Sequence, residues 1–170
     1  MTGLEFHSFP GTQMPRLWEA ASRLRWDVFV AEQEVPPVLE IDARDFQDST
    51  LHLVAVDSAG VQAAGRLLTA TPSNYYIGRV VVDKRSRGKG YGKAIIEYAV
   101  NESARLLPPG ENGTVTLDAQ EQAIGFYEMC GFELTDAPRF LDAGIWHRTM
   151  VRPIVSTRLP AEAESAAPLD

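Results

Sequence analysis

The sequence has few of the features that hold disulfide-rich, metal-binding or membrane proteins together. Its 170 residues include one cysteine, Cys130, which excludes an internal disulfide and a cysteine-based metal cluster. No apolar run reaches about 18 residues, so no transmembrane helix is expected. The N-terminus lacks a charged segment followed by an apolar run, so no signal peptide is expected. The cytoplasm is therefore the expected location.

Basic residues are also scarce, because 16 Lys and Arg face 23 Asp and Glu for a net charge of −7. We expect no nucleic-acid partner and no membrane partner, and an amine suits such a chain better than an anion. A hydrophobic content of 45% is typical of an ordinary globular protein. We expect one domain over residues 1–155 and a flexible Ala/Glu/Pro-rich tail over residues 156–170.

Hydrophobic periodicity predicts alternating strands and helices. Alternation and β-branched runs predict strands at 4–9, 51–57, 61–71, 75–82, 114–119, 132–134 and 145–153. Apolar residues at helical spacing predict helices over 15–31, 93–107 and 121–130. Residues 35–50 are rich in acid, and we expect a loop with a short helical turn there.

The richest motif is the stretch 79–93, which reads as a strand, a glycine-rich basic loop and the start of a helix. Gly88, Gly90 and Gly92 let backbone N–H groups point into one concavity, and a helix N-terminus adds free N–H groups and partial positive charge. Arg87 and its basic neighbours add full charges. The loop is therefore a candidate site for a phosphate or pyrophosphate.

Several interpretations of this loop compete. A Walker loop fails twice, because Arg87 stands where the first glycine belongs and Ala94 where the magnesium-binding hydroxyl belongs. A dinucleotide fingerprint is weak, because the third glycine comes one residue early. The pattern R-x-x-G-x-G, made by Arg87, Gly90 and Gly92, resembles the acyl-CoA pyrophosphate loop of the GNAT N-acetyltransferase superfamily. A glycine-rich turn with solvated charges is the remaining alternative.

A second motif favours the GNAT interpretation. Residues 118–132 resemble the later GNAT motif, in which a polar residue ends a strand and A-x-x-F-Y-x-x-x-G-F follows. Here Gln120 stands where many members carry Asn. Residues 25–33, 40–53, 65–67 and 142–147 are similar to the ElaA-like branch. The resemblance covers about residues 4–152 and implies an α/β (α+β) fold, with a mixed, mostly antiparallel sheet of six to seven strands and helices on both faces.

The resemblance also implies acetyl-CoA as acetyl donor and no metal. The pyrophosphate would lie on the loop, the backbone of Val80 and Val82 would pair with the pantetheine arm, and neighbouring strands would splay to admit it. The implied cofactor-binding residues are Val80, Val81, Val82, Arg87, Gly88, Lys89, Gly90, Tyr91, Gly92, Lys93, Gln120, Ala123, Phe126 and Tyr127.

The resemblance gives Tyr127 the role of proton donor to the leaving sulfur, with a core aromatic as the alternative. Base candidates are His147, Glu32, Asp42 and His52, since histidine titrates near neutral pH. The expected substrate-binding residues are Glu32, Gln33, Asp42, His52 and Arg66, with a solvated acidic loop as the alternative for the carboxylates.

The resulting hypothesis is an acyl-CoA-dependent N-acetyltransferase that acts on a primary amine of a small molecule or peptide. Two alternatives stay open: a catalytically inactive CoA-binding regulatory module, and a nucleotide-binding module that uses the loop alone. Many relatives dimerise, so a homodimer is compatible with the resemblance. The acceptor amine is not readable from the sequence.

Overall fold

The computed structural model describes residues 3–159, which form one eight-stranded sheet in the order β1-β2-β3-β4-β5-β8-β6, with β7 paired to β8. The strands are β1 Glu5–Pro10, β2 Leu51–Asp57, β3 Gly60–Thr71, β4 Asn74–Val82, β5 Asn112–Gln120, β6 Glu133–Leu134, β7 Phe140–Asp142 and β8 Ile145–Val155. The helices are α1 Pro15–Arg25, α2 Pro37–Glu40, α3 Tyr91–Leu106 and α4 Ile124–Met129, with a π-helix at Trp26–Glu32 and 3₁₀ turns at Ala43–Phe46, Lys84–Ser86 and Glu121–Ala123.

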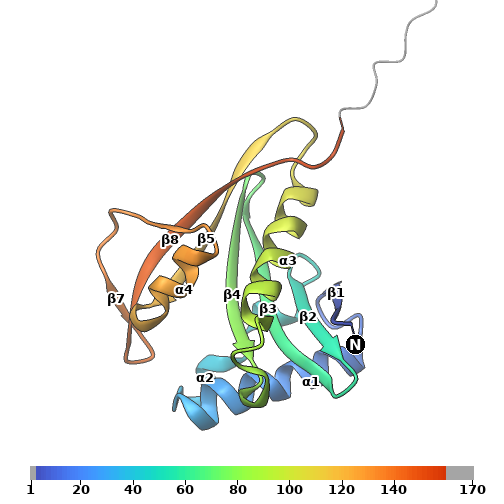
Figure 1. Cartoon of the computed structure of the whole chain (residues 1–170), viewed down its shortest axis with the longest axis vertical. Coiled ribbons are helices and arrows are strands. Elements are labelled where there is room, and N and C mark those ends of the chain that lie inside the picture. Colours follow the sequence, from blue (N-terminus) through green and yellow to red (C-terminus); the bar gives the residue numbers. More distant parts are fainter. Residues whose placement is uncertain (1–2, 160–170) are drawn as a thin grey trace, which may run out of the picture.

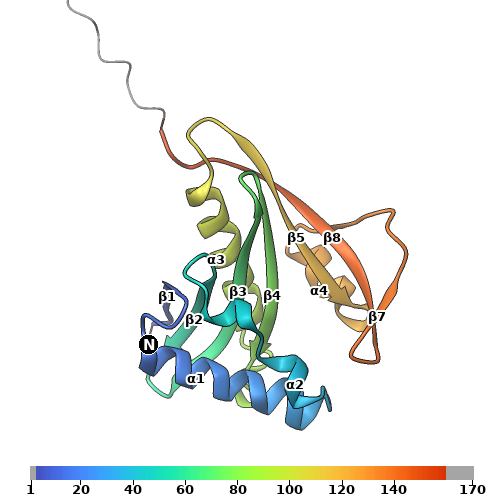
Figure 2. The same ribbon diagram turned by 180° about the vertical axis from the view of Figure 1, so that it is seen from behind.

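Helices cover both faces of the sheet. α3 and α4 lie on the face toward the viewer in Figure 1, and α1 and α2 lie on the opposite face, seen in Figure 2. Ile95 and Ile96 of α3 pack in the larger core with strand residues such as Leu117, and Leu24 of α1 packs in the smaller core with Val81. The predicted fold class is confirmed, because the sheet is mixed and mostly antiparallel with helices on both faces.

The parallel pair β4–β5 is short, and this shapes the site. Its register runs only from Asn74–Thr114 to Ile77–Leu117, after which the two strands diverge (Figure 1). On the other side of β4, the register with β3 shifts by one residue between Ala64 and Arg66. Arg79 lies in this bulge with a φ of 53°, a left-handed conformation that is uncommon for a residue other than glycine. The predicted splaying of these two strands is present.

The strand β7 is missing from the sequence prediction, which gave seven strands at most. It has three residues and forms a hairpin with β8 through Ala143 and Gly144, whose φ values are 49° and 77°. Two positive φ values fit a type I′ turn, which sequence rules recognise as Asn-Gly or Asp-Gly. Alanine in the first turn position hides this hairpin from the sequence.

The predicted helix 15–31 is present but changes type along its length. From Trp26 to Glu32 it is a π-helix, and the Gln33 N–H donates to the Val28 carbonyl five residues earlier at 3.0 Å. The wider turn places Phe29 and Gln33 on a cleft beside the sheet. π-turns within helices are often found at functional sites.

The predicted tail lies mostly outside the described residues, since 160–170 are not described. Its first residues are held, because Ser156 N–H donates to Glu111 at 2.9 Å and Thr157 N–H to Ala104 at 3.2 Å. The single domain and the flexible tail remain predictions. Among the helices of residues 3–159, none has the length and apolarity that a membrane span needs.

Candidate active site

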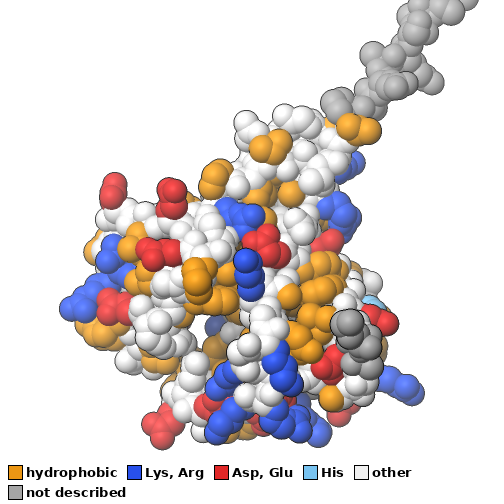
Figure 3. Space-filling model, in the orientation of Figure 1, with side chains coloured by type: hydrophobic (Ala, Val, Ile, Leu, Met, Phe, Trp, Pro, Cys, Tyr) orange, Lys and Arg blue, Asp and Glu red, His pale blue; other side chains and the backbone are white. Residues whose placement is uncertain are grey.

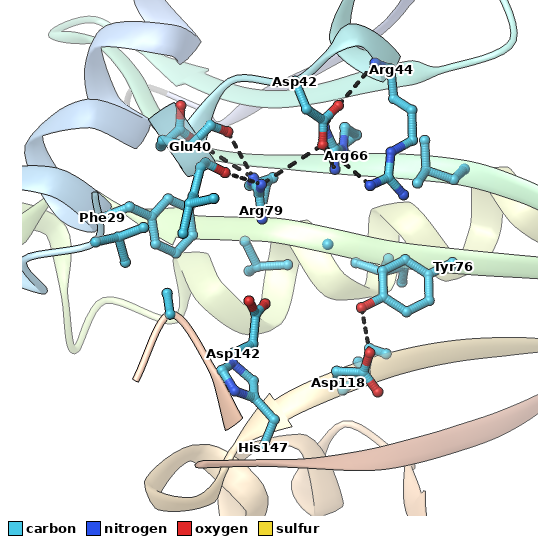
Figure 4. Close-up of a pocket in the computed structure, with 18 of the residues that line it drawn as sticks. Phe29, Glu40, Asp42, Arg44, Arg66, Tyr76, Arg79, Asp118, Asp142 and His147 are labelled. Atoms are coloured by element: carbon cyan, nitrogen blue, oxygen red, sulfur yellow. Dashed lines mark hydrogen bonds and ion pairs between the residues drawn. The ribbon is translucent and has the colours of Figure 1, made fainter. Parts of the chain in front are cut away.

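A cleft of about 970 Å³ opens where β4 and β5 diverge. One wall, the arginine wall, comes from α2, the turn Ala43–Phe46, β3 and β4, and the other, the β5–β8 wall, comes from β5, the β7–β8 hairpin and α4 (Figure 4). Of the predicted site residues, the cleft collects Gln33, Asp42, Arg66, Val80, Gln120, Ala123, Tyr127 and His147. Glu32, His52 and Val81 are not among its lining residues.

The glycine loop has the backbone geometry of an anion site. Gly88 and Gly90 have φ values of 79° and 82°, which L side chains rarely adopt. Gly90 is the N-cap of α3 and supplies no side-chain cap, so the first N–H groups of the helix lack a side-chain acceptor from the cap. Lys and Arg side chains gather at this loop, at the lower end of the molecule in Figure 3; the exposed ones are Lys84, Arg85, Arg87 and Lys89.

The two sequence motifs meet at Gly92. A Cβ at this position would lie 3.3 Å from Phe126 Cζ and 3.5 Å from Val82 Cγ2, which leaves little room for a side chain. Phe126 of α4 therefore packs on the first turn of α3. This contact places the second motif beside the glycine loop and explains why a glycine fits there.

Arg87 is paired with a residue from the π-helix. Its Nη1 lies 2.8 Å from Glu32 Oε2, its Nη2 lies 3.0 Å from Glu32 Oε1, and its Nε donates to the Val82 carbonyl at 3.3 Å. Glu32 was predicted as a base or a substrate ligand. The structure instead places its carboxylate at the loop, engaged with the guanidinium.

At the end of β4, the backbone of Val82 faces away from β3. Asp83 N–H donates to Gln62 on β3 at 2.8 Å, so by alternation the peptide groups of Val82 point the other way, as its carbonyl contact with Arg87 also shows. Val81 is a core residue, with 3% of its surface exposed. Tyr91 turns toward β2, where its hydroxyl donates to Asp57 at 3.2 Å. The Lys89 and Lys93 side chains are exposed.

Gln120 and Gln33 connect the two walls. Gln120 Nε2 donates to Gln33 Oε1 at 2.9 Å, and Gln122 donates to Gln120 Oε1 at 2.5 Å. The longer amide at position 120 therefore contacts the π-helix across the cleft. The structure brings these two predicted residues together.

Tyr127 lies on the cleft between apolar neighbours. Its ring packs edge-on against Phe126 and Phe132, with centroid distances of 5.0 Å and 6.2 Å. Burial raises the pKa of Tyr127 to about 12, so the phenol keeps its proton throughout the physiological range. Among residues 3–159, no hydrogen bond is found for its hydroxyl, which leaves it available as a donor.

His147 faces the cleft from β8, opposite Gln120 in the β5–β8 register. Its Nδ1 lies 2.8 Å from the Ile145 carbonyl, and its ring stacks on Phe140 at 5.7 Å. Since a carbonyl can only accept, Nδ1 carries the proton and Nε2 is the basic atom. The imidazole is thus held in one orientation with its basic nitrogen free to take a proton.

Two cleft residues of the β4–β5 junction were not predicted. The Tyr76 hydroxyl donates to Asp118 Oδ2 at 2.7 Å (Figure 4), and the Thr149 hydroxyl donates to Asp118 Oδ1 at 2.7 Å. Burial and this carboxylate raise the pKa of Tyr76 well above its ordinary value. The pair spans 42 positions of sequence. The only local feature of the sequence that points to this pair is an aspartate, Asp118, within an otherwise mostly apolar strand.

The predicted acidic loop is part of an ion-pair network. Arg25 Nε lies 2.6 Å from Glu40 Oε1 and Arg25 Nη1 lies 2.8 Å from Asp45 Oδ1, with all three side chains at most 2% exposed. Arg66 Nη1 lies 2.9 Å from Asp45 Oδ1 and 3.0 Å from Asp42 Oδ1. Burial alone would raise the pKa of Asp45, but the hydrogen bonds and charge of Arg25 outweigh it and lower that pKa to about 2.

His52 belongs to this network and not to the cleft. It is 2% exposed, its Nε2 lies 2.8 Å from the Asp45 carbonyl, and its ring lies 4.5 Å from Trp18 and 5.6 Å from Phe9. Burial lowers the pKa of His52. The structure therefore does not bring His52 to the substrate, and it leaves Asp42 already bonded to arginine.

Comparison with known proteins identifies the fold and the motifs together. The family model described as an acetyltransferase (GNAT) domain matches residues 26–153, which is most of the chain and includes both motifs.

The chain belongs to the GNAT acetyltransferase family.

Its GNAT relatives include an uncharacterised N-acetyltransferase, YjcF of Bacillus subtilis, which is 35% identical over 76% of this chain and 87% of its own length. Among solved structures, an acyl-CoA N-acyltransferase from Pseudomonas aeruginosa has a TM-score of 0.76 and 30% identity, over 88% of this chain and 99% of its own. Escherichia coli ElaA has a TM-score of 0.75 and 25% identity over the same shares, as the predicted branch implies. A B. subtilis acetyltransferase in complex with CoA, at 15% identity and a TM-score of 0.61 over 90% of this chain and all of its own, shares the fold.

Metal ligation is not indicated by the geometry of residues 3–159, where no group of three or more His, Cys, Asp or Glu side chains could hold an ion. The cleft is lined instead by a half-buried phenol, Tyr127, and by His147, and Phe126 beside Tyr127 packs on Gly92 of the glycine loop.

Proposed function

We propose that the chain is an N-acetyltransferase that moves the acetyl group of acetyl-CoA directly onto a primary amine of a small molecule or peptide. The observation that carries the proposal is the presence of Tyr127 and His147 on one cleft, with Phe126, the neighbour of Tyr127, packed on Gly92 of the glycine loop. One side chain has a proton to give and the other has a lone pair to take one. Bound acetyl-CoA would supply the thioester whose acyl carbon accepts the amine.

The residues present fit acetyl-CoA. The left-handed Gly88 and Gly90 and the start of α3 provide N–H groups and positive potential for a pyrophosphate, and the Val82 N–H, which faces away from β3, would suit an extended amide-containing arm. The CoA found with the Bacillus acetyltransferase of this fold supports the same donor class. Arg87 would hold a phosphate oxygen with its guanidinium fork.

Tyr127 would act as the acid. Its pKa of about 12 keeps the phenol protonated, and its hydroxyl can donate that proton as the sulfur leaves. His147 would act as the base, because Nδ1–H is held by Ile145 and Nε2 can take the proton of the attacking amine. Asp118 lies on the same wall but is already an acceptor for Tyr76 and Thr149.

The test combines binding with turnover. Saturating CoA is expected to raise the melting temperature, because a ligand at about 100 times its Kd stabilises by about 2.7 kcal/mol. With acetyl-CoA and a panel of amines, free thiol and N-acetyl product are expected. Tyr127→Phe is expected to lower kcat about 100-fold with little change in CoA affinity, as loss of a general acid does. Tyr98→Phe, a partly buried tyrosine beside Phe6, is the matched control.

Absence of any stabilisation by CoA or its thioesters would refute the proposal. Firm CoA binding without product across a broad amine panel would favour the inactive regulatory module instead. Equal rates for Tyr127→Phe and the unaltered protein would remove Tyr127 from the reaction and leave it a packing residue.

A further inference from the structure

The two walls of the cleft carry opposite charge. The arginine wall presents Arg44, Arg66 and Arg79 against Glu40 and Asp42, a formal balance of one positive charge, and the buried pair Arg25–Asp45 behind it adds no net charge. The β5–β8 wall presents Asp118, Asp142 and His147, whose Nδ1 is turned to the Ile145 carbonyl (Figure 4). A molecule held between them feels positive potential on one side and negative potential on the other.

Arg44 is the most exposed arginine of this wall, at 59% against 25% for Arg79. Arg25 and Arg66 are bound by buried carboxylates, and Arg79 donates to the carbonyls of Leu39 and Glu40 at 2.8 Å and 3.0 Å. Arg44 is 59% exposed, and its only ion pair among the described residues is a loose one of 3.5 Å to Asp42 Oδ2.

Asp42 has little capacity left for Arg44. Its Oδ1 accepts from Arg66 Nη1 at 3.0 Å and from the Arg44 backbone N–H at 2.9 Å, and its Oδ2 accepts from Arg66 Nη2 at 3.2 Å. The Arg44 guanidinium therefore keeps most of its five N–H donors for a ligand. A carboxylate is the group that matches this planar fork.

Asp142 is the free anion of the opposite wall. It is exposed at the turn of the β7–β8 hairpin, points into the cleft beside His147, and pairs with no cation within residues 3–159 (Figure 4). The carboxylates of Asp142 and Asp118 would stabilise an ammonium group bound near them. His147 Nε2 would be the nearby base that accepts its proton. The wall that holds the proposed base is thus the wall that attracts the amine.

Apolar side chains lie between the charged ends. Phe29, Val38 and Leu39 line the cleft from the π-helix and α2, and Val38 and Leu39 are 81% and 49% exposed. Leu68 adds to them from β3. An aliphatic or aromatic side chain on the acceptor would cover this surface.

The geometry points to a zwitterionic acceptor, an apolar amino acid or a close derivative, with its carboxylate on Arg44 and its amine toward Asp142 and His147. This inference rests on the proposed function for the reaction, but the binding part stands without it. Polyamines fit less well, because a second cation would lie against the arginine wall. The acidic loop that would favour a polyamine from sequence is neutralised by Arg25 and Arg66.

The test uses ligands matched in everything but charge. Leucine, leucinamide and 3-methylbutylamine share a side chain and an amine, and only leucine carries the carboxylate. With acetyl-CoA, kcat/KM is expected to be at least tenfold higher for leucine than for 3-methylbutylamine, since hydrogen bonds to charged groups are the stronger ones. Spermidine is expected to react more slowly than leucine.

The variant Arg44→Ala is expected to reduce the leucine-to-3-methylbutylamine ratio at least tenfold, mainly through the KM for leucine. Arg16→Ala, an exposed arginine of α1, is expected to leave the ratio unchanged. Calorimetry in the presence of CoA measures leucine binding to the unaltered protein and to Arg44→Ala without any turnover.

The outcomes separate the two proposals. Leucine binding that depends on Arg44 without any acetylation supports the inference and refutes the proposed function. Acetylation that prefers spermidine or 3-methylbutylamine, or a ratio that Arg44→Ala does not change, supports the function and overturns the inference. No binding and no acetylation of leucine by a protein that acetylates other amines overturns it as well.

Discussion

The glycine loop and the proposed acceptor end of the cleft are built in different ways. In the loop, where we propose that the cofactor binds, the backbone of consecutive residues gives the geometry, and exposed side chains such as Arg87 add charge to it. At the acceptor end, buried side chains from α1, α2 and β3 neutralise one another before any ligand is considered. Substitutions at the first end should therefore change affinity, and substitutions in the buried network at the second should change stability.

The largest effect is expected from Arg25→Ala. It would leave Glu40 and Asp45 buried without their main cation, and breaking a buried ion pair costs about 3–5 kcal/mol. Urea unfolding measures this loss in the free energy of unfolding. Arg23→Ala, an exposed neighbour in α1, is the control and is expected to change stability by under about 0.5 kcal/mol. A small loss for Arg25→Ala would mean that the network is not structural.

The pH dependence of stability follows from Asp45. Its folded pKa of about 2 lies below an unfolded value near 3.9, so its contribution is fully present above about pH 5 and is lost as pH falls toward 2. The side chain is fully buried, and the contribution is roughly 2 kcal/mol.

Asp45→Asn is therefore expected to destabilise the protein at pH 7 and to flatten the acid limb between pH 5 and pH 2. Unfolding curves at several pH values compare it with Asp48→Asn, which changes an exposed carboxylate. If stability still falls between pH 5 and pH 2 in Asp45→Asn as it does in the unaltered protein, other carboxylates cause the pH dependence.

The smallest effects are expected at the cofactor end, where one ion pair gives two opposite results. Arg87→Ala should weaken CoA binding about tenfold through the loss of a charged hydrogen bond. Glu32→Gln should strengthen it a few-fold, because Glu32 competes with phosphate for the same guanidinium.

Calorimetric titration with CoA measures both changes, and stability should change little in either variant. Arg85→Ala, on the same loop but paired with Asp83, is the control for the loss of one positive charge. Equal losses of CoA affinity in Arg87→Ala and Arg85→Ala would mean that Arg87 contributes only its positive charge and no specific hydrogen bond. Weaker binding in Glu32→Gln would mean that Glu32 orients Arg87 and does not compete.

The strand, glycine loop and helix over residues 79–93 could be predicted because their information is local. Glycines at every second position, a β-branched strand before them and a helix after them lie within about fifteen residues. The structure adds the contact of Phe126 with Gly92, which explains why the second motif accompanies the first. Residue type and spacing carry this part because backbone conformation makes the site.

The acceptor end could be found but not interpreted. The resemblance identified Asp42, Arg66 and His52. The net charge at the cleft, however, depends on their partners Arg25 and Asp45. Ion pairs between segments that are distant in the chain leave no periodic pattern in the sequence. The π-turn shifts Glu32 to the loop, and no propensity rule gives that shift. Tyr76 and Asp118 meet only because β4 and β5 pair across 42 positions.

The divergence of β4 and β5 also has a consequence for aggregation. Unpaired strand edges are a liability, because another chain can extend the sheet along them. Here the unpaired length of β4 lies in the interior of the sheet, in a wedge that closes at Ile77 and Leu117. The unpaired length of β4 is thus flanked by strands of its own sheet and is not one of the sheet's edges.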